Sequence, residues 1–231
     1  MWPILSPPDH YADEAETLWQ LYNELAPRDP AGPRRLLELG AGGGHMLVHL
    51  SQHFQCTAAD LSSAMLENCA RLVPEARRVV ADMRELRLGE LFDVVLIHDA
   101  IDYMRSTEDV QAALATAAAH LAPGGVLFVA PTYIRDNFLD GDVAEDSNSD
   151  AGLTYFSFVH DPDPNDTEYE LILVYLIRNP KTRAVDLIED RHKCGLFSES
   201  HWLTLLTQAG FNATLIEEEK AWTLFAGPKN P

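Results

Sequence analysis

Glycines and carboxylates near the start of the chain have the types and spacing of a ligand-binding site. Residues 38–44 read E-L-G-A-G-G-G, so Glu38 stands two residues before a G-x-G-x-G turn. Glycine is entropically costly in regular structure, and a cluster of it marks a place where backbone must come close to a partner. Asp60 lies twenty residues after Gly40, and Asp82 comes later still. Carboxylates at these places would accept hydrogen bonds from ligand hydroxyl or amino groups.

A second group of polar side chains follows later apolar runs and has the composition of an acid–base or acceptor-binding site. It comprises His98, Asp99, Tyr103, Tyr133, Arg191 and His192. His98 fits equally well as a hydrogen-bonded histidine in a buried turn, and His192 as a surface residue on an edge strand. Tyr11 either forms part of an N-terminal lid, where its ring would suit a cation, or packs in the core. His98-Asp99 has no matching partners, so no metal site is expected.

The elements that must position these residues alternate between strands and helices. Apolar runs predict strands over 34–40, 55–60, 76–82, 92–99 and 126–131, the last one after a turn at 123–125. Helical spacing is found over 11–25, 45–54 and 62–73, and in the alanine-rich stretch after the capping box from Ser106 to Asp109. This alternation predicts a parallel, doubly wound α/β sheet with helices on both faces. Such sheets bind ligands at the carboxyl ends of their strands.

The pattern changes after Pro131. Three strand-like runs, 153–161, 168–178 and 184–193, are separated by turn-rich segments with no room for a helix, so they are expected to be antiparallel. A helix capped by Ser198 and ended by Gly210 follows, and then two strands over 211–219 and 221–227. We therefore expect residues 1–130 and 196–231 to form the core, with residues 131–195 as an inserted, strand-rich unit.

The glycine turn distinguishes between two ligand classes. Dinucleotide enzymes use G-x-G-x-x-G, which would require glycine at position 45, where this chain has His45. Over about residues 35–130 the sequence resembles the class I S-adenosylmethionine-dependent methyltransferases. The resemblance rests on the order of its motifs, which are the acid, the glycine turn, Asp60, Asp82-Met83 and the later L-A-P-G-G. The resemblance implies a Rossmann-like methyltransferase fold with a doubly wound, mostly parallel seven-stranded sheet.

The same resemblance implies roles for individual residues. The glycine turn would meet the amino acid end of S-adenosylmethionine, with Glu38 on its ammonium group. Asp60 would take the ribose hydroxyls, while Asp82 would lie by the adenine amino group and Met83 on the ring. The expected cofactor site comprises Tyr11, Glu38, Gly40, Ala41, Gly42, Asp60, Leu61, Met65, Asp82, Met83 and His98. His192, Tyr103 and His98 are the candidates for catalysis.

Beyond residue 120 the sequence resembles small-molecule methyltransferases that include the amino-sugar N-methyltransferases, which insert an antiparallel sheet at this place. Two features depart from that group. Only Tyr11 remains of its tyrosine-rich N-terminal stretch, and Tyr103 stands where the group carries a histidine. We predict methyl transfer to a small-molecule acceptor, at nitrogen or oxygen, by in-line displacement with the acceptor held in position. The alternatives are a non-catalytic S-adenosylmethionine-binding module and an NAD-type dehydrogenase, the latter disfavoured by His45.

The composition of the chain limits the classes of molecule that it is expected to bind and the compartment in which it is expected to act. The net charge of −19 argues against nucleic acid. Residues 136–170 hold eleven acidic residues and no Lys or Arg, either as a solvated rim or as a cleft mouth that favours a cationic acceptor. Three unpaired cysteines fit a reducing compartment. The N-terminus lacks the basic start of a signal peptide, and no apolar run suggests a membrane span, so a cytoplasmic protein is expected. Exposed edges of the inserted strands could pair two copies into a homodimer.

Overall fold

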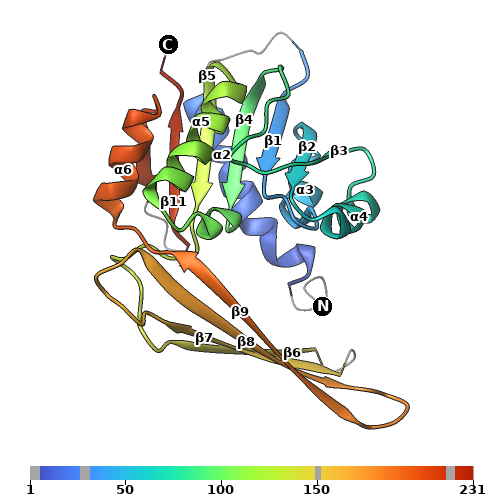
Figure 1. Cartoon of the computed structure of the whole chain (residues 1–231). Helices are drawn as coiled ribbons and strands as arrows, with labels where there is room; N and C mark the ends of the chain where they lie inside the picture. Colours follow the sequence, from blue (N-terminus) through green and yellow to red (C-terminus); the bar gives the residue numbers. More distant parts are fainter. Residues whose placement is uncertain (1–5, 27–31, 149–151, 217–221, 231) are drawn as a thin grey trace.

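Two β-sheets organise the chain in the computed structural model, which describes residues 6–26, 32–148, 152–216 and 222–230 (Figure 1). The larger sheet has seven strands in the order β10-β11-β5-β4-β1-β2-β3. Its strands are β1 (Arg35–Leu39), β2 (Gln55–Asp60), β3 (Arg77–Val80), β4 (Phe92–His98), β5 (Leu121–Ala130), β10 (Thr214–Ile216) and β11 (Leu224–Pro228). β1 to β5 are parallel, whereas β11 is antiparallel to both β5 and β10. The doubly wound, mostly parallel seven-stranded sheet predicted from the sequence is confirmed.

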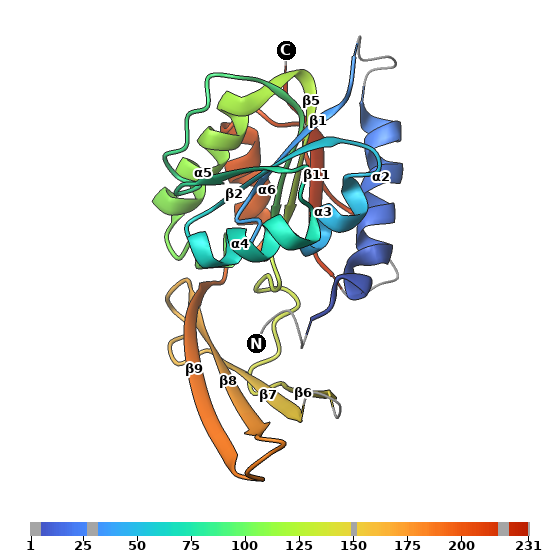
Figure 2. The same cartoon turned by 90° about the vertical axis from the view of Figure 1, so that its right-hand side faces the viewer.

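Helices cover both faces of this sheet (Figure 2). The 3-10 turn η1 (Pro8–Tyr11) leads into α2 (Ala12–Leu25), which packs with α3 (His45–Leu50) and α4 (Ser63–Leu72) on one face through residues such as Leu18, Leu47 and Leu66. On the other face lie α5 (Thr107–His120) and α6 (Glu199–Gln208), which contribute Leu114 and Trp202. Ser106 and Ser198 cap these two helices as predicted, accepting from Asp109 N–H and His201 N–H.

The central strands are apolar on both sides because both of their faces are covered. Leu36, Leu37 and Leu39 of β1 are at most 1% exposed, as are the apolar residues Val94 to Ile97 of β4. A strand buried on both faces reads as a continuous apolar run, which explains why the strands of the core were readable from sequence. A polar side chain within such a strand is therefore out of place, and Glu38 is one.

The smaller sheet is inserted between β5 and α6 and lies on the side of the carboxyl ends of the parallel strands (Figures 1 and 2). It has four antiparallel strands in the order β6-β7-β8-β9. They are β6 (Val143–Asn148), β7 (Leu153–His160), β8 (Glu168–Arg178) and β9 (Val185–Gly195). The predicted inserted antiparallel sheet is confirmed, although the sequence indicated only three of its strands.

A short turn after β4 joins the two sheets. This turn, η2 (Ala100–Tyr103), continues into Arg105, whose carbonyl oxygen accepts from the Thr167 hydroxyl at 2.9 Å. A Cβ added at Gly195 would overlap the carbonyl oxygen of Met104, so the end of β9 lies directly against this turn. The position of the inserted sheet is thus fixed at its base by backbone contact with the core.

Two expected boundaries were wrong, and one strand was not predicted. The helix predicted over 45–54 ends at Leu50, because the chain must turn at 51–54 to enter β2. β5 begins at Leu121 and runs through the predicted turn at 123–125, with a register shift opposite β4. Residues 143–148 form the edge strand β6 despite their acidic sequence. Residues 217–221, at the ends of the two last predicted strands, lie outside the described residues. Among the described helices, none is long and apolar enough to span a membrane.

Candidate functional site

The glycine turn lies where β1 ends and α3 begins, and its backbone conformation requires glycine. Gly40, Gly42 and Gly44 all have positive φ, at 79°, 51° and 79°. A Cβ at Gly40 would overlap the Cβ of Ala100 and lie 2.9 Å from Cε of Met83. The amides of Gly40 and Ala41 both donate to the carbonyl of Ala59, which fixes the turn against β2. The result is a tightly held turn at the carboxyl edge of the sheet, packed at Gly40 against Ala100 and Met83.

Glu38 is a buried carboxyl group beside this turn. It is 3% exposed, and its Oε2 atom has no hydrogen-bond partner among the described residues. Burial raises its pKa to about 8, with smaller opposing and reinforcing contributions from His98, Asp60 and Asp99. A buried, unpartnered carboxylate oxygen is costly, and such a group is retained where a ligand completes it. Glu38 therefore suits a cationic ligand group at the glycine turn.

Asp60, at the end of β2, organises the next part of the site. Its Oδ2 accepts from Gly42 N–H at 2.7 Å and its Oδ1 from Ser62 N–H at 2.8 Å. The carboxylate thus ties the glycine turn to the start of α4, and each oxygen retains acceptor capacity for a ligand hydroxyl. Leu61 is 68% exposed beside it, and Met65 Cε lies 3.4 Å from the position of a Cβ at Gly42. These two apolar side chains offer a surface to a flat ligand group.

Asp82 follows β3 and is bound by a neighbouring arginine. Both of its carboxylate oxygens accept from the Arg84 side chain, at 2.6 to 3.1 Å, and Oδ1 also accepts from Arg84 N–H. Hydrogen bonds from Arg84 lower the pKa of Asp82. Arg84 in turn bonds Asp109 at the start of α5. Arg84 was not anticipated from the sequence, and it holds Asp82 ionised and fixed next to Met83.

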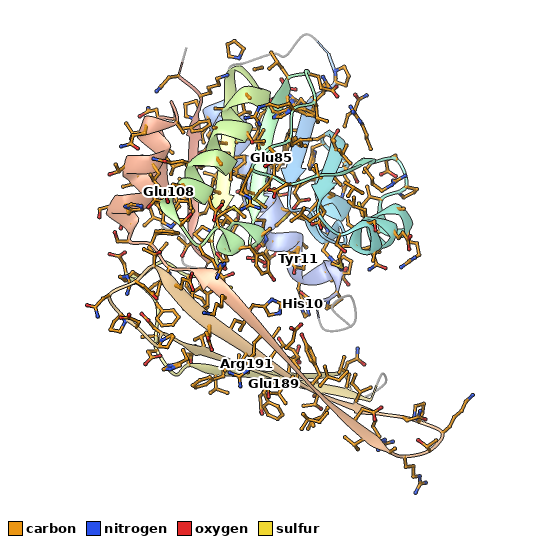
Figure 3. The ribbon with its side chains drawn as sticks, in the orientation of Figure 1. His10, Tyr11, Glu85, Glu108, Glu189 and Arg191 are labelled. Carbon is orange, nitrogen blue, oxygen red and sulfur yellow. The ribbon has the colours of Figure 1, made fainter. Side chains whose placement is uncertain are left out.

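A cavity of about 300 Å³ opens at the carboxyl ends of β4 and β5. Its walls come from the N-terminal turn, both strand ends and the start of β11: Ser6, His10, Tyr11, Glu14, His98, Asp99, Ala130, Pro131, Thr132, Trp222 and Thr223. Figure 3 shows His10 and Tyr11 at the end of the core that faces the inserted sheet, which carries Glu189 and Arg191 on β9. Tyr11 thus lines a cavity, with its ring centroid 5.9 Å from that of His98.

His98 forms the floor of this cavity between two carboxylates. Its Nε2 is 2.8 Å from Glu14 Oε2, and its Nδ1 is 3.2 Å from Asp99 Oδ2. Burial alone would lower its pKa, but the two carboxylates outweigh burial and raise the pKa well above 6.5. Asp99 has a φ of +42°, which is unusual for a residue with a side chain. His98 is accordingly an imidazolium held by two acids, and Glu14 joins α2 to β4.

Tyr103 and His192 meet at the junction between the two sheets. The Tyr103 hydroxyl lies 3.1 Å from His192 Nδ1, and His192 Nε2 lies 3.2 Å from Asp190 Oδ2. Close by, the buried Asp102 carboxylate accepts from Tyr169 Oη at 3.1 Å and from Thr132 N–H. The structure therefore brings together two residues that lie 89 positions apart in the sequence.

The predicted site residues fall into three neighbouring groups. The first group lies around the ends of β1 to β3 and comprises the glycine turn, Glu38, Asp60, Leu61, Met65, Asp82 and Met83. The second group, Tyr11 and His98, lines the cavity. The third group, Tyr103 and His192, lies at the junction. Tyr133 instead packs edge-to-face on Phe138 and Tyr169, and Arg191 pairs with Glu189 and Glu170. Sequence reasoning missed Glu14, Arg84 and Asp190. Glu14 meets His98 only through a tertiary contact, whereas Arg84 and Asp190 lie two residues from Asp82 and His192, a spacing from which the pairs could have been found. Among the described residues, no group of three or more His, Cys, Asp or Glu side chains is arranged to hold a metal.

These features fit S-adenosylmethionine as a cofactor. The unpartnered Glu38 oxygen suits its ammonium group, and the glycine turn beside it would supply backbone groups to the methionyl moiety. Asp60 has acceptor capacity for ribose hydroxyls, while Leu61 and Met83 flank the place expected for the purine. The turn also lacks the third glycine that a pyrophosphate-binding loop needs, because His45 stands there.

Comparison with known proteins supports the same cofactor. Residues 36–125 match the family described as a methyltransferase domain. The chain is 31% identical over 210 residues to dTDP-3-amino-3,4,6-trideoxy-α-D-glucopyranose N,N-dimethyltransferase from Streptomyces venezuelae, spanning 90% of this chain and 86% of that enzyme. It is also 29% identical to dTDP-3-amino-3,6-dideoxy-α-D-glucopyranose N,N-dimethyltransferase from Streptomyces fradiae, over 87% of this chain and 78% of that enzyme.

The fold is shared with a solved relative over nearly its whole length. The crystal structure of Streptomyces venezuelae DesVI superposes with a TM-score of 0.84 at 28% identity, covering 94% of this chain and 91% of that chain. The chain therefore belongs to the class I S-adenosylmethionine-dependent methyltransferases, in the group related to the amino-sugar N-methyltransferases, and is an enzyme that transfers a methyl group from S-adenosylmethionine to a small-molecule acceptor.

Proposed function

We propose that the acceptor atom is the nitrogen of a small amine, of the amino-sugar class, and that the inserted unit 131–195 builds the acceptor side of the site. The two Streptomyces enzymes described above are both named as N,N-dimethyltransferases of amino sugars. The observation that carries the proposal in this chain is the cavity at the carboxyl ends of β4 and β5, which Pro131 and Thr132 line at the start of the inserted unit. Its residues His98 and Asp99 lie near the cofactor cradle, which consists of Glu38, the glycine turn and Asp60. An acceptor there would face the cofactor from the side of the inserted sheet.

Methyl transfer requires the protein mainly to position the cofactor and the acceptor. When bound, S-adenosylmethionine supplies the methyl group and the leaving sulfur. Glu38, the turn from Gly40 to Gly42, and Asp60 hold the cofactor in one orientation, and Asp82 and Met83 hold its purine. Since a neutral amine is already a nucleophile, the remaining task of the chain is to align it in line with the departing bond and to accept its proton. We assign the proton-accepting role to the group formed by Tyr103 and His192.

The charge of the cavity favours an acceptor that arrives as a cation. Glu14 and Asp99 place two carboxylates at its wall against one imidazolium, that of His98. The inserted unit adds fourteen acidic residues against six Lys and Arg. A concave surface of one sign concentrates ligands of the opposite sign. An amine would be drawn toward the cavity in its ammonium form and would react as the neutral amine.

The outer face of the inserted sheet supports a homodimer. Residues opposite one another in antiparallel strands share a face, so Val143, Phe158 and Ile172 lie together, on the side away from the face that carries His192. Val143 and Phe158 are 59% and 37% exposed, and Leu187 on the same face is 66% exposed. We propose that two copies bury this face. Light scattering of Leu187→Glu against the parent tests it, and an unchanged mass would remove the proposal.

The three cysteines support a reducing compartment, and we propose the cytoplasm. Cys56, Cys69 and Cys194 are all buried and free. Burial raises the pKa of the Cys56 and Cys194 thiols to about 12, which keeps them protonated and unreactive.

A direct assay tests the proposed acceptor. The protein is incubated with S-adenosylmethionine and a panel made of the dTDP-3-amino sugar named for the Streptomyces venezuelae relative, the matching hydroxyl sugar and simple primary amines. We expect mass spectrometry to detect one or two added methyl groups on amines alone. Gly40→Ala should abolish transfer, while Gly89→Ala, at another positive-φ glycine with open space around it, should retain it. Methylation of the hydroxyl sugar but of no amine would contradict the proposal, and cofactor binding without any transfer would favour a non-catalytic module.

A further inference from the structure

The junction between the two sheets contains a row of three side chains that links the acceptor side of the site to solvent. Tyr103, at the end of η2, contacts His192 of β9, and His192 contacts Asp190 of the same strand. Asp190 and His192 are two residues apart in a strand, so both side chains leave the same face. Tyr103 is 53% exposed, the side chain of His192 25% and that of Asp190 56%, so His192 is the most covered member and both ends of the row reach solvent-accessible space.

We propose that Asp190, His192 and Tyr103 form a proton relay that removes the proton from the methylated acceptor nitrogen and so permits a second methyl transfer. This inference rests on the proposed function, since it requires an amine acceptor. It assigns Asp190 a positioning role that neither the sequence nor the relatives indicated. Tyr103 is the member that would touch the acceptor.

The arrangement of the three side chains sets the direction of the hydrogen bonds. A carboxylate near His192 Nε2 favours the tautomer that carries its proton on Nε2, because the carboxylate can only accept. Nδ1 is then unprotonated and accepts from the Tyr103 hydroxyl. The lone pairs of the Tyr103 oxygen are left free to accept a hydrogen bond from the acceptor nitrogen. Without Asp190, either ring nitrogen could carry the proton and this order would be lost.

The proton balance of the step is complete. Methyl transfer to a neutral primary amine leaves a secondary ammonium, which has no lone pair and cannot take a second methyl group. An N–H bond of that ammonium breaks as the Tyr103 oxygen takes the proton, and the hydroxyl proton of Tyr103 passes to His192 Nδ1. The imidazolium formed is stabilised by Asp190 and releases its proton to water. No oxidant, reductant or metal takes part.

The surroundings of Tyr103 keep it a relay member and not a free phenolate. Burial, together with the nearby groups Cys194, Asp102, Asp190 and Asp99, raises the pKa of the Tyr103 phenol to about 12. The phenol therefore passes a proton on only as it receives one. These four groups, with His192, are the titratable neighbours of the phenol that β9 and the turn after β4 supply.

The backbone at the junction maintains the alignment. A Cβ at Gly195 would overlap the carbonyl oxygen of Met104, the residue after Tyr103. Glycine at this position allows β9 to approach the turn closely enough for His192 to reach the tyrosine. Gly195→Ala should push β9 away from the turn at Met104 without removing any relay group. The variant therefore tests whether the relay depends on this geometry.

The first test measures the tautomer of His192 directly and needs no acceptor. Protein labelled with ¹⁵N-histidine is examined by two-dimensional NMR, and the loss of one signal set in His192→Asn assigns the residue. We expect the Nε2–H tautomer in the parent and a mixture of tautomers in Asp190→Asn. The matched control is Asp186→Asn, the same change on the same face of β9 and farther from the core. A protonated Nδ1 in the neutral parent ring would overturn the relay.

The second test counts methyl groups. With excess S-adenosylmethionine and the dTDP-3-amino sugar or its monomethyl form, Asp190→Asn should lower the rate of the second transfer tenfold or more. The first transfer should slow less than the second, because a neutral primary amine can react before the relay is needed, and cofactor affinity should stay unaltered. The second transfer should then depend more steeply on pH, because hydroxide must replace the relay. An unchanged ratio of dimethyl to monomethyl product in Asp190→Asn, Tyr103→Phe and Gly195→Ala alike would overturn the relay. A parent that methylates no amine would refute the proposed function, while the NMR result would still judge the relay.

Discussion

The core and the inserted sheet hold their functional residues by opposite means. In the core, Glu38 is 3% exposed and the Gly40 turn is bonded to β2 through backbone groups, so the cofactor side is fixed by the sheet itself. In the inserted sheet, Asp190 is exposed and His192 is partly exposed, and their alignment depends on the junction with η2. The difference implies that the core is a rigid half that serves one cofactor. The inserted sheet is then a second half, whose alignment depends on few contacts with the core. Changes in the core should therefore abolish binding, and changes in the inserted sheet should alter turnover.

The largest effect is expected at Gly40. Alanine there combines the strain of a positive φ with overlap on Ala100 and a 2.9 Å contact to Met83. We expect affinity for S-adenosylmethionine to fall at least 100-fold by calorimetry, which corresponds to about 3 kcal/mol. Gly89→Ala has a similar φ of 71° and no neighbour within 4 Å, so it isolates the cost of strain alone. Equal losses in the two variants would show that the close packing of the Gly40 turn against Ala100 and Met83 does not matter for cofactor binding.

The second-largest effect on cofactor affinity is expected at Asp60. Asp60→Asn keeps the shape of the side chain but removes the charge that accepts from Gly42 and Ser62 amides and, when the cofactor binds, from ribose hydroxyls. Loss of hydrogen bonds to a charged group costs roughly 1.5–3 kcal/mol, so cofactor affinity should fall by about 10- to 150-fold. In the inserted sheet, Asp166 Oδ1 accepts from Glu168 N–H in the same way at 2.8 Å. Asp166→Asn should leave the dissociation constant unchanged, and a matching loss there would refute the division into two halves.

The same division explains what the sequence could predict. The cofactor half depends on short stretches in which a strand, a turn and a helix follow one another, so Glu38, Asp60 and Asp82 could be placed at strand ends from local pattern alone. Burial on both faces gave the core strands unbroken apolar runs. The strand β6 was missed because V-A-E-D-S-N has no apolar alternation, being an exposed edge strand that needs charge to avoid further pairing.

The acceptor half could not be read in this way, because its contacts join distant parts of the chain. Glu14 meets His98 across 84 residues, and Tyr103 meets His192 across 89. Asp190 acquires its role only through the register that sets β9 against β8 and the closeness of Gly195 to Met104. Pairings of that kind depend on tertiary structure, and no local spacing in the sequence specifies them.

Glu38 offers a smaller, pH-dependent test of the rigid half. Burial raises its pKa to about 8, so below that pH the free protein holds it protonated. An ammonium group binds the ionised form, so binding must release a proton, and affinity should rise with pH between 5.5 and 7.5 by up to about tenfold per pH unit. Calorimetry in buffers of different ionisation enthalpy would detect the released proton. Glu38→Gln should bind more weakly at pH 7.5 and lose the slope, whereas Glu24→Gln, an exposed residue of α2, should keep it. A parent whose affinity is flat over this range would contradict the assignment.

The smallest effect is expected at the junction where the two halves meet, at Asp102. Burial raises its pKa to about 7, while the bonds from Thr132 and Tyr169 oppose that rise. In the unfolded chain the same carboxyl ionises near pH 4. The folded state therefore binds more protons than the unfolded state between about pH 4 and 7, and this residue makes stability fall as pH rises through that range.

Asp102→Asn cannot ionise and removes that dependence. The stability of the variant relative to the parent should thus improve by about 1–2 kcal/mol between pH 5.5 and 8.5, measured by urea unfolding at the two pH values. Glu38 has the same environment in both proteins, so its own contribution cancels in the difference. Because the amide retains only part of the bonding to Thr132 and Tyr169, the alignment of the inserted sheet should loosen while the cofactor cradle stays intact. Turnover should accordingly fall without loss of cofactor affinity, and a parallel loss of both would mean that the junction and the cradle are one rigid unit.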